Sequence, residues 1–268
     1  MILLLGAQGN LGSSLYSHLN GTEDIHLLDR ETVNELTRDN LEKSQISIFE
    51  NMRSKVDFVI VAAGAIDNNF SKSYLERLNF NLPRNLLELG LRFGFKTVTF
   101  GSIHEYTNIN SNYMQSKRKF RDLLLSNQDF NFLHFQLNTL FSRGRVSSSS
   151  FLGQLKYSIT EKVPFRMSSG HQLRQFHETD QVTRVVLHAI MNSKHVSSFV
   201  PVNSGQVFSL KDVATYILNR VHLPQLLQLD VLDDPDHEVY SRDFFDSFPI
   251  NLEREFDPLE NLFQKVYS

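Results

Sequence analysis

Short apolar runs recur along the first half of the chain, and each ends at a glycine, a small residue or a polar residue. Runs of this kind are typical of strands that are buried on both faces of a parallel sheet. The pattern predicts strands within 2–5, 24–30, 56–64, 97–101 and 130–137, with one later return to the sheet near 199–202. A further short strand is possible at 46–49.

The segments between these runs have the spacing of helices. We expect helices at 13–19, across 70–93 with a kink at Pro83, and around 113–117. Because strand and helix alternate, the sequence predicts an α/β fold built on a doubly wound parallel sheet.

Three glycines separate the first strand from its helix: Gly6, Gly9 and Gly12. Glycines at this spacing let the backbone turn tightly, approach a pyrophosphate closely and pack the helix on the sheet. The helix N-terminus then offers N–H groups and a positive dipole end to the phosphates. The sequence therefore predicts a Rossmann-type sheet that binds a dinucleotide.

Two further features fit this cofactor. Asp29 ends the second run about 20 residues after the loop, where such folds place the carboxylate that binds the adenosine ribose. Asp29 favours NAD, whereas Arg30 beside it could pair with the 2′-phosphate of NADP, so both cofactors stay open. Small residues end the third run and leave room for a flat ligand. The expected cofactor-binding residues are Gly6, Gln8, Gly9, Asn10, Leu11, Gly12, Asp29, Arg30, Ala62, Ala63, Gly64, Tyr113 and Lys117.

Tyr113 and Lys117 carry the candidate chemistry. Residues four apart on a helix share one face, and an ammonium beside a phenol is expected to lower the phenol pKa. Such a tyrosine could exchange a proton with an alcohol or a ketone oxygen. Ser102 ends the fourth strand and could hold the same oxygen. All these residues follow strand C-termini, where open α/β sheets bind ligands.

These motifs together resemble the extended short-chain dehydrogenase/reductase family, of the NAD-dependent epimerase/dehydratase type. The resemblance covers most of the chain and includes Asn79 followed by 85–87, the segments 174–182 and 202–205, and the residues 208–210. It implies that Tyr113 is the general acid/base, that Lys117 holds the nicotinamide ribose, and that Ser102 binds the reacting oxygen. It also implies that Asn79 supports a proton relay.

Within the family the sequence is most similar to nucleotide-sugar 4-keto reductases such as CDP-abequose synthase and dTDP-4-dehydrorhamnose reductase. This implies NAD(P)-dependent reduction of a nucleotide-activated 4-keto-deoxyhexose for surface polysaccharide biosynthesis. Dehydratases carry adjacent Asp and Glu after the serine position, whereas this chain has Ile103 and His104, with Glu105 one step further. An NAD-dependent epimerase and a catalytically silent dinucleotide-binding module remain the alternatives.

The resemblance also implies how the chain is divided and where a nucleotide sugar binds. The Rossmann domain would cover 1–145, completed by part of 178–205, and a smaller substrate lobe would cover mainly 146–268. The expected substrate-binding residues are His104, Asn138 and Arg174, with further arginines at 143, 145 and 166 suited to a diphosphate. Two residues depart from the family pattern: Gln136 replaces a frequent arginine, and Gln175 a customary aspartate.

Composition narrows the choice of partners. A net charge of −3 and a pI near 6.4 give no general attraction to nucleic acid or to an anionic membrane. The absence of cysteine excludes disulfides and thiol catalysis. No apolar run approaches the roughly 20 residues of a membrane span, and the histidines lack the spacing of a zinc site. We therefore expect a cytoplasmic enzyme without a metal, and a homodimer from the family resemblance.

Overall fold

The computed structural model describes the whole chain except residues 22, 53–55, 67–69, 193–196 and 268. The chain forms two compact units. The first unit comprises Met1–Tyr106, Asn110–Leu137 and Thr183–Pro201, and the second comprises Thr107–Ile109, Asn138–Val182 and Val202–Ser268. The N-terminal part of the first unit thus ends at Leu137, before the boundary expected near 145. The unit also includes Thr183–Pro201.

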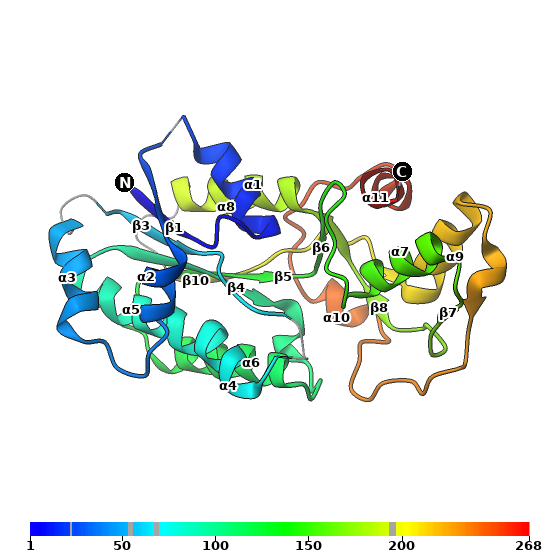
Figure 1. Ribbon diagram of the computed structural model, residues 1–268, viewed down its shortest axis with the longest axis horizontal. Coiled ribbons are helices and arrows are strands. Elements are labelled where there is room, and N and C mark those ends of the chain that lie inside the picture. Colours follow the sequence, from blue (N-terminus) through cyan, green and yellow to red (C-terminus); the bar gives the residue numbers. More distant parts are fainter. Residues whose placement is uncertain (22, 53–55, 67–69, 193–196, 268) are drawn as a thin grey trace. The chain divides into compact units, whose positions relative to one another are not determined.

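Among the residues described, six parallel strands form the sheet of the first unit (Figure 1). In sheet order they are β10 (Ser198–Pro201), β5 (Phe132–Leu137), β4 (Lys96–Ser102), β3 (Phe58–Val61), β1 (Ile2–Leu5) and β2 (Ile25–Leu28). The order reverses between β1 and β3, and open α/β sheets bind ligands in the crevice at such a point. The expected doubly wound parallel fold is confirmed.

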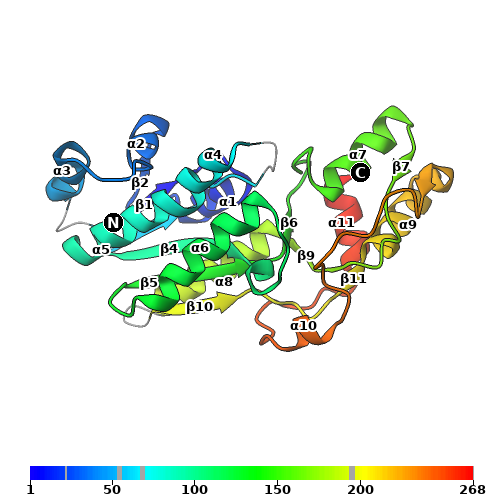
Figure 2. The same ribbon diagram turned by 90° about the horizontal axis from the view of Figure 1, so that it is seen from below.

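Helices cover both faces of this sheet, which explains why its strands read as continuous apolar runs. Figure 1 shows α1 and α8 on one face and α5 and α6 on the other, and the turned view of Figure 2 agrees. The helices of the first unit are α1 (Asn10–Leu19), α2 (Arg30–Glu35), α3 (Lys43–Met52), α4 (Lys72–Glu76), α5 (Leu82–Phe93), α6 (Asn112–Ser126) and the part of α8 (Thr179–Asn192) that follows Val182.

The short strand considered possible at 46–49 does not form, because this segment lies within helix α3. Ile46 and Ile48 alternate like strand residues, but the buried side chains are Gln45 and Phe49, four positions apart on one helix face. Phe49 joins a core cluster with Leu5 of β1. Tertiary burial of this face decided the local structure.

The expected helix at 70–93 is interrupted just before Pro83. Between α4 and α5 the residues Arg77–Asn81 form a turn of π-helix, which is wider than an α-turn. Proline has no N–H to donate and crowds the carbonyl four residues earlier. The wider turn directly before Pro83 accommodates the proline at the start of α5, within a helical segment that continues from α4.

The second unit contains helices packed on short paired strands. Its helices are α7 (Phe151–Glu161), α9 (Leu210–Arg220), α10 (Asp243–Asp246), α11 (Pro258–Val266) and the first turn of α8. Its strands are β6 (Thr139–Phe141), β7 (Phe165–Arg166), β8 (Leu173–Arg174), β9 (Phe176–Glu178), β11 (Phe208–Ser209) and β12 (Leu227–Gln228). They pair as β6 with β9, β7 with β12 and β8 with β11. Side chains of α7, α9 and α11 share one apolar cluster (Figure 2).

None of the helices in the described part of the chain combines the length and the apolar character needed to cross a membrane.

Candidate active site

Two of the three glycines between β1 and α1 are required by the packing of the chain itself. Gly6 has a φ of +84°, and a Cβ added to it would lie 2.4 Å from the backbone nitrogen of Ala63. A Cβ on Gly12 would lie 2.0 Å from the carbonyl oxygen of Gly6. These contacts hold the end of β1 against the end of β3 and the start of α1 against the loop.

Gly9 is different, since a Cβ there would meet only the Gly6 carbonyl, at an ordinary distance of 3.4 Å. Gly9 is the N-cap of α1, it has no side chain to bond the first helical turn, and that turn carries no acid. A bare helix N-terminus of this kind is a site for an anion. The loop therefore fits the pyrophosphate of a dinucleotide, which Gly9 would approach closely.

Asp29 lies at the same edge of the sheet. Leu5 of β1 pairs with Leu28 of β2, so Gly6 and Asp29 are the residues that leave two neighbouring strands. The Asp29 side chain accepts a hydrogen bond of 2.7 Å from the Thr32 N–H and caps α2, which begins at Arg30. This bond to Thr32 holds the pKa of the exposed Asp29 carboxyl below its ordinary value. Asp29 thus presents a fixed carboxylate where the ribose is expected.

Asn79 ties three parts of the site together from within the π-turn. Its amide accepts from the Ala65 N–H at 3.1 Å and donates to the Ala65 carbonyl at 2.8 Å, next to Gly64. It also donates to Ser116 Oγ at 3.1 Å, and Ser116 in turn donates to the Tyr113 carbonyl. Asn79 therefore positions the segment after β3 and the helix of Tyr113; its expected part in a proton relay stays a prediction.

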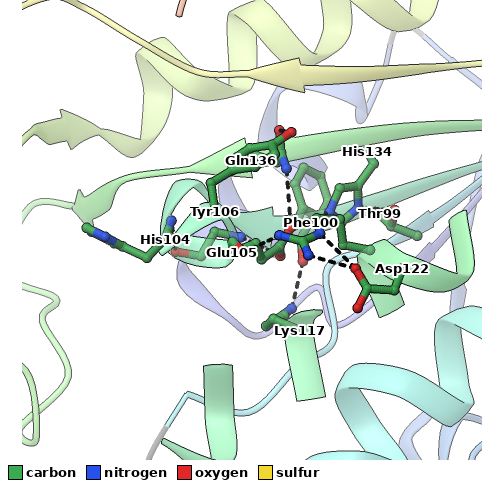
Figure 3. A network of polar contacts seen from close by, with 11 residues as sticks. Thr99, Phe100, His104, Glu105, Tyr106, Lys117, Asp122, His134 and Gln136 are labelled. Carbon is green, nitrogen blue, oxygen red and sulfur yellow. Dashed lines mark hydrogen bonds and ion pairs between the residues drawn. The ribbon is translucent and has the colours of Figure 1, made fainter. Parts of the chain in front are cut away.

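Helix α6 carries Tyr113 and Lys117 to the C-terminal end of β4. Ser111 caps the helix by accepting from the Met114 N–H at 3.1 Å. The Lys117 ammonium donates to the Phe100 carbonyl at 2.7 Å (Figure 3). It also lies 5.9 Å from the centre of the Tyr113 ring. Because Phe100 precedes Ser102 by two residues in β4, this bond fixes Lys117 beside the strand that ends in Ser102.

Proton affinities in this cluster differ from the sequence expectation. Burial raises the pKa of the Tyr113 phenol, and the negative charge of Glu105 raises it further. Burial lowers the pKa of Lys117, with Glu105 acting in the opposite sense. The expectation that Lys117 lowers the pKa of Tyr113 is therefore wrong for this structure. Loss of hydration has the largest effect on the phenol. The ammonium contacts the face of the ring and the Phe100 carbonyl.

Sequence reasoning assigned no role in the site to Glu105. It is 1% exposed, and its Oε1 accepts a hydrogen bond of 2.8 Å from the Ser102 N–H. Its neighbours His134 and Gln136 alternate in the otherwise apolar strand β5. Two polar residues two apart in a buried strand were the signal for a polar cluster on that face. The backbone N–H of His104 donates to Ser102 Oγ at 3.2 Å, and the His104 ring points away from Glu105 (Figure 3).

The candidate substrate residues of the second unit have partners within that unit. Asn138 is buried and donates to the Val202 carbonyl at 2.9 Å, and its amide oxygen has no partner among the described residues. Arg174 forms an ion pair with Glu238 and donates to the Leu173 carbonyl at 2.8 Å. A diphosphate would have to compete with Glu238 for Arg174, so the two substrate roles stay predictions.

The departure at Gln175 has a structural explanation. Gln175 donates to Asn203 Oδ1 at 2.6 Å and accepts from the Ser204 N–H at 3.1 Å. In this orientation the side-chain oxygen of Gln175, Oε1, also accepts a hydrogen bond from His177 Nε2 at 2.9 Å. Asn203 continues the network to the carbonyls of Phe245 and Phe248. A neutral glutamine thus joins β9 to the C-terminal segment, where an aspartate could only accept hydrogen bonds.

The family profile described as "NAD dependent epimerase/dehydratase family" matches residues 2–203, which is most of the chain. The chain belongs to this family, as its motifs predicted. A nicotinamide dinucleotide is accordingly its cofactor, in agreement with the glycine loop and with Asp29. No curated protein matches the sequence significantly.

Several solved structures share the fold over nearly their whole length. MoeE5 in complex with UDP-glucose and NAD is 17% identical, with a TM-score of 0.74 over 98% of this chain and 96% of that one. A dTDP-4-dehydrorhamnose reductase from Clostridium acetobutylicum is 17% identical, with a TM-score of 0.72 over 98% and 97%. A UDP-glucose 4-epimerase from Thermus thermophilus in complex with NAD is 15% identical, with a TM-score of 0.72 over 98% and 97%.

The two kinds of glycine in the loop can be separated by substitution. Gly12→Ala should lower the free energy of unfolding by about 1–3 kcal/mol, because the new methyl overlaps the Gly6 carbonyl. Gly9→Ala should leave stability within about 0.5 kcal/mol and weaken NAD binding at least tenfold. Thermal unfolding and cofactor titration by calorimetry measure both effects. A stable Gly9→Ala protein with wild-type NAD affinity would remove Gly9 from the cofactor site.

His177 should make the protein less stable in acid. Burial lowers the pKa of His177 from 6.5 to about 3. Below pH 6.5 the unfolded chain binds a proton there and the folded chain does not, so stability falls as the pH decreases from 6.5 towards 3. Between pH 7 and pH 5, His177→Gln should reduce this loss by about 2 kcal/mol. Chemical unfolding at both pH values measures the loss of stability, and His171→Gln, which alters an exposed histidine, is the control. An equal loss in the wild type, His177→Gln and His171→Gln would contradict the prediction.

Proposed function

We propose that this protein is an NAD(P)-dependent reductase of a nucleotide-activated 4-keto-deoxyhexose, acting in surface polysaccharide biosynthesis. The observation that carries the proposal is the cluster at the end of β4, the strand that ends in Ser102. Lys117 of α6 donates a hydrogen bond to the Phe100 carbonyl of this strand, and its ammonium lies over the Tyr113 ring. The bound nicotinamide supplies the hydride for such a reduction. Tyr113 would give its proton to the resulting sugar oxyanion, while the Ser102 hydroxyl donates a hydrogen bond to it.

The proton state of Tyr113 is the one with which reduction begins. Burial and the Glu105 charge raise the pKa of this phenol, so it keeps its proton at neutral pH. Reduction begins with a protonated tyrosine, whereas an epimerase must first take a proton from the substrate alcohol. An NAD-dependent epimerase remains the second candidate, because the family includes epimerases and one of the similar structures is a UDP-glucose 4-epimerase.

The substrate class rests on the similar structures and on the motifs. MoeE5 was solved with UDP-glucose, and another similar structure is a dTDP-4-dehydrorhamnose reductase. We propose that His104, Asn138 and Arg174 contact the nucleotide sugar, with the unpartnered Asn138 amide oxygen as a polar group for it. A homodimer in the cytoplasm is the corresponding expectation for the assembly and its location.

Tyr113→Phe should reduce turnover by about 10²–10⁴-fold, the usual contribution of a general acid. Affinity for NADH should change less than about threefold, because the ring and the Lys117 contact remain. Tyr157→Phe, which alters an exposed tyrosine of the second unit, is the matched control. Steady-state rates and cofactor titrations measure both properties. Wild-type turnover in Tyr113→Phe would refute the assignment of the acid.

A panel of nucleotide-linked sugars distinguishes the reductase from the epimerase. We expect NADH or NADPH absorbance to fall in proportion to the amount of one nucleotide-linked 4-keto-6-deoxy sugar. Faster turnover with NADH would identify Asp29 as the residue that determines cofactor specificity, and faster turnover with NADPH would identify Arg30. Conversion of a nucleotide sugar to its epimer with no net change in cofactor absorbance would identify the epimerase instead.

A further inference from the structure

Glu105 lies at the centre of a polar cluster between β4, β5 and α6, and the proposed function gives it no part (Figure 3). It belongs to a 3₁₀ turn, Ile103–Tyr106, that leads directly out of β4. Oε1 accepts from the Ser102 N–H at 2.8 Å, and Oε2 lies 3.3 Å from both His134 Nε2 and Gln136 Nε2. The carboxylate thus touches the backbone of Ser102 and two side chains of the neighbouring strand.

The surroundings are shaped for this carboxylate. A Cβ added to Gly101 would lie 2.1 Å from Glu105 Oε1 and 2.4 Å from His134 Nε2, so only glycine leaves the space. Thr99 Oγ1 holds His134 Nδ1 at 2.8 Å, which directs the other ring nitrogen at Glu105. Gln136 Oε1 accepts from the Tyr106 hydroxyl at 3.0 Å, which directs its NH₂ group at Glu105.

The main chain of the turn is held as firmly as the side chain. The Arg121 guanidinium of α6 donates to the Glu105 carbonyl, pairs with Asp122 and lies 5.5 Å from the centre of the Tyr106 ring. Gln136, where many members of the family have arginine, is therefore part of the same structure: it joins Tyr106 to Glu105 without adding a charge.

Glu105 is ionised in this setting. Burial alone would raise the pKa of its carboxyl, but His134, the Ser102 N–H and the Lys117 ammonium together hold that pKa below its ordinary value. The charged or titratable groups that face it are His134 from β5 and Tyr113, Lys117 and Arg121 from α6. A negative charge without hydration acts over a longer range than one at the surface, so it reaches the phenol and the ammonium.

We propose that Glu105 is a positioning residue of the active site: its buried carboxylate fixes the backbone that carries Ser102 and places a negative charge beside α6, the helix of Tyr113 and Lys117. The inference rests on the proposed function, because a tyrosine that retains its proton is ready to protonate a sugar oxyanion. The same charge opposes the reverse step, in which Tyr113 would have to accept a proton and stand as phenolate.

Titration of Tyr113 in the free protein tests the charge directly. Tyrosines labelled with ¹³C in the ring are followed by NMR against pH, and the Tyr113 signal is the one absent from Tyr113→Phe. Glu105→Gln should lower the pKa of Tyr113 by about one pH unit, the effect of removing one nearby buried charge. Glu105→Asp, which keeps the charge, should lower it much less. Glu76→Gln, on a partly exposed carboxylate paired with Lys119 of α6, is the control and should not shift it.

Kinetics test the positioning and the direction of the reaction. In Glu105→Gln the rising limb of the oxidation profile and the falling limb of the reduction profile, which both report the Tyr113 proton, should move down by about one pH unit. In Glu105→Asp the shorter side chain should release Ser102 and lower kcat by about tenfold or more, with KM for the cofactor unchanged. A purely structural role would change stability without moving the pH profile.

The outcomes separate this inference from the proposed function. The NMR titration needs no substrate, so a protein that turns over no 4-keto sugar still reveals whether Glu105 acts on Tyr113. A folded Glu105→Gln protein with an unmoved Tyr113 titration overturns the inference, even if the enzyme proves to be a reductase. If Glu105→Gln does not fold, Glu105→Asp decides: wild-type kcat overturns the inference, and a reduced kcat with unchanged Tyr113 titration supports it.

Discussion

The parallel pairing of β1, β3 and β4 is the constraint on which the first unit depends. It brings the ends of these strands to one edge, so that Gly6, Ala62 and Phe100, two residues before Ser102, follow one another across the sheet. The bond from Lys117 to the Phe100 carbonyl then ties helix α6, which carries Tyr113, to this edge. Cofactor loop and catalytic side chains are thus positioned by the same backbone register, and no long loop has to fold back to assemble them.

Buried polar groups add precision to that arrangement. Asn79 links the segment after β3 to α6 through Ser116, and Glu105 links the end of β4 to β5. Each such group is costly to bury unless it is fully bonded, which favours a single geometry over near alternatives. The Glu105 cluster also combines geometry with charge, since the carboxylate that fixes Ser102 determines how firmly the neighbouring phenol holds its proton.

The sheet, the glycine loop and the helix of Tyr113 could be predicted because apolar runs, glycine spacing and helical periodicity are local patterns of the sequence. The segment at 46–49 was misassigned because four residues are too few to distinguish alternation from a helical face. The partners of Glu105 lie 29 and 31 positions away, and Glu238 lies 64 positions from Arg174, so spacing could not reveal them. The pKa of Tyr113 depends on burial, which a motif does not contain.

The wide turn at Arg77–Asn81 has a consequence for how the chain can tolerate insertions and deletions. A π-turn contains one residue more than an α-turn, and one residue corresponds to a rotation of about 100° around a helix axis. The π-turn absorbs this extra residue, so the faces of α4 and α5 stay aligned and Leu75 remains buried. Deleting one residue here would convert the turn to an α-turn, and the rearranged turn would move Asn79 away from its bonds to Ala65 and Ser116. The length of this segment is therefore as constrained as the identity of Asn79, although no single side chain in the segment would reveal the constraint.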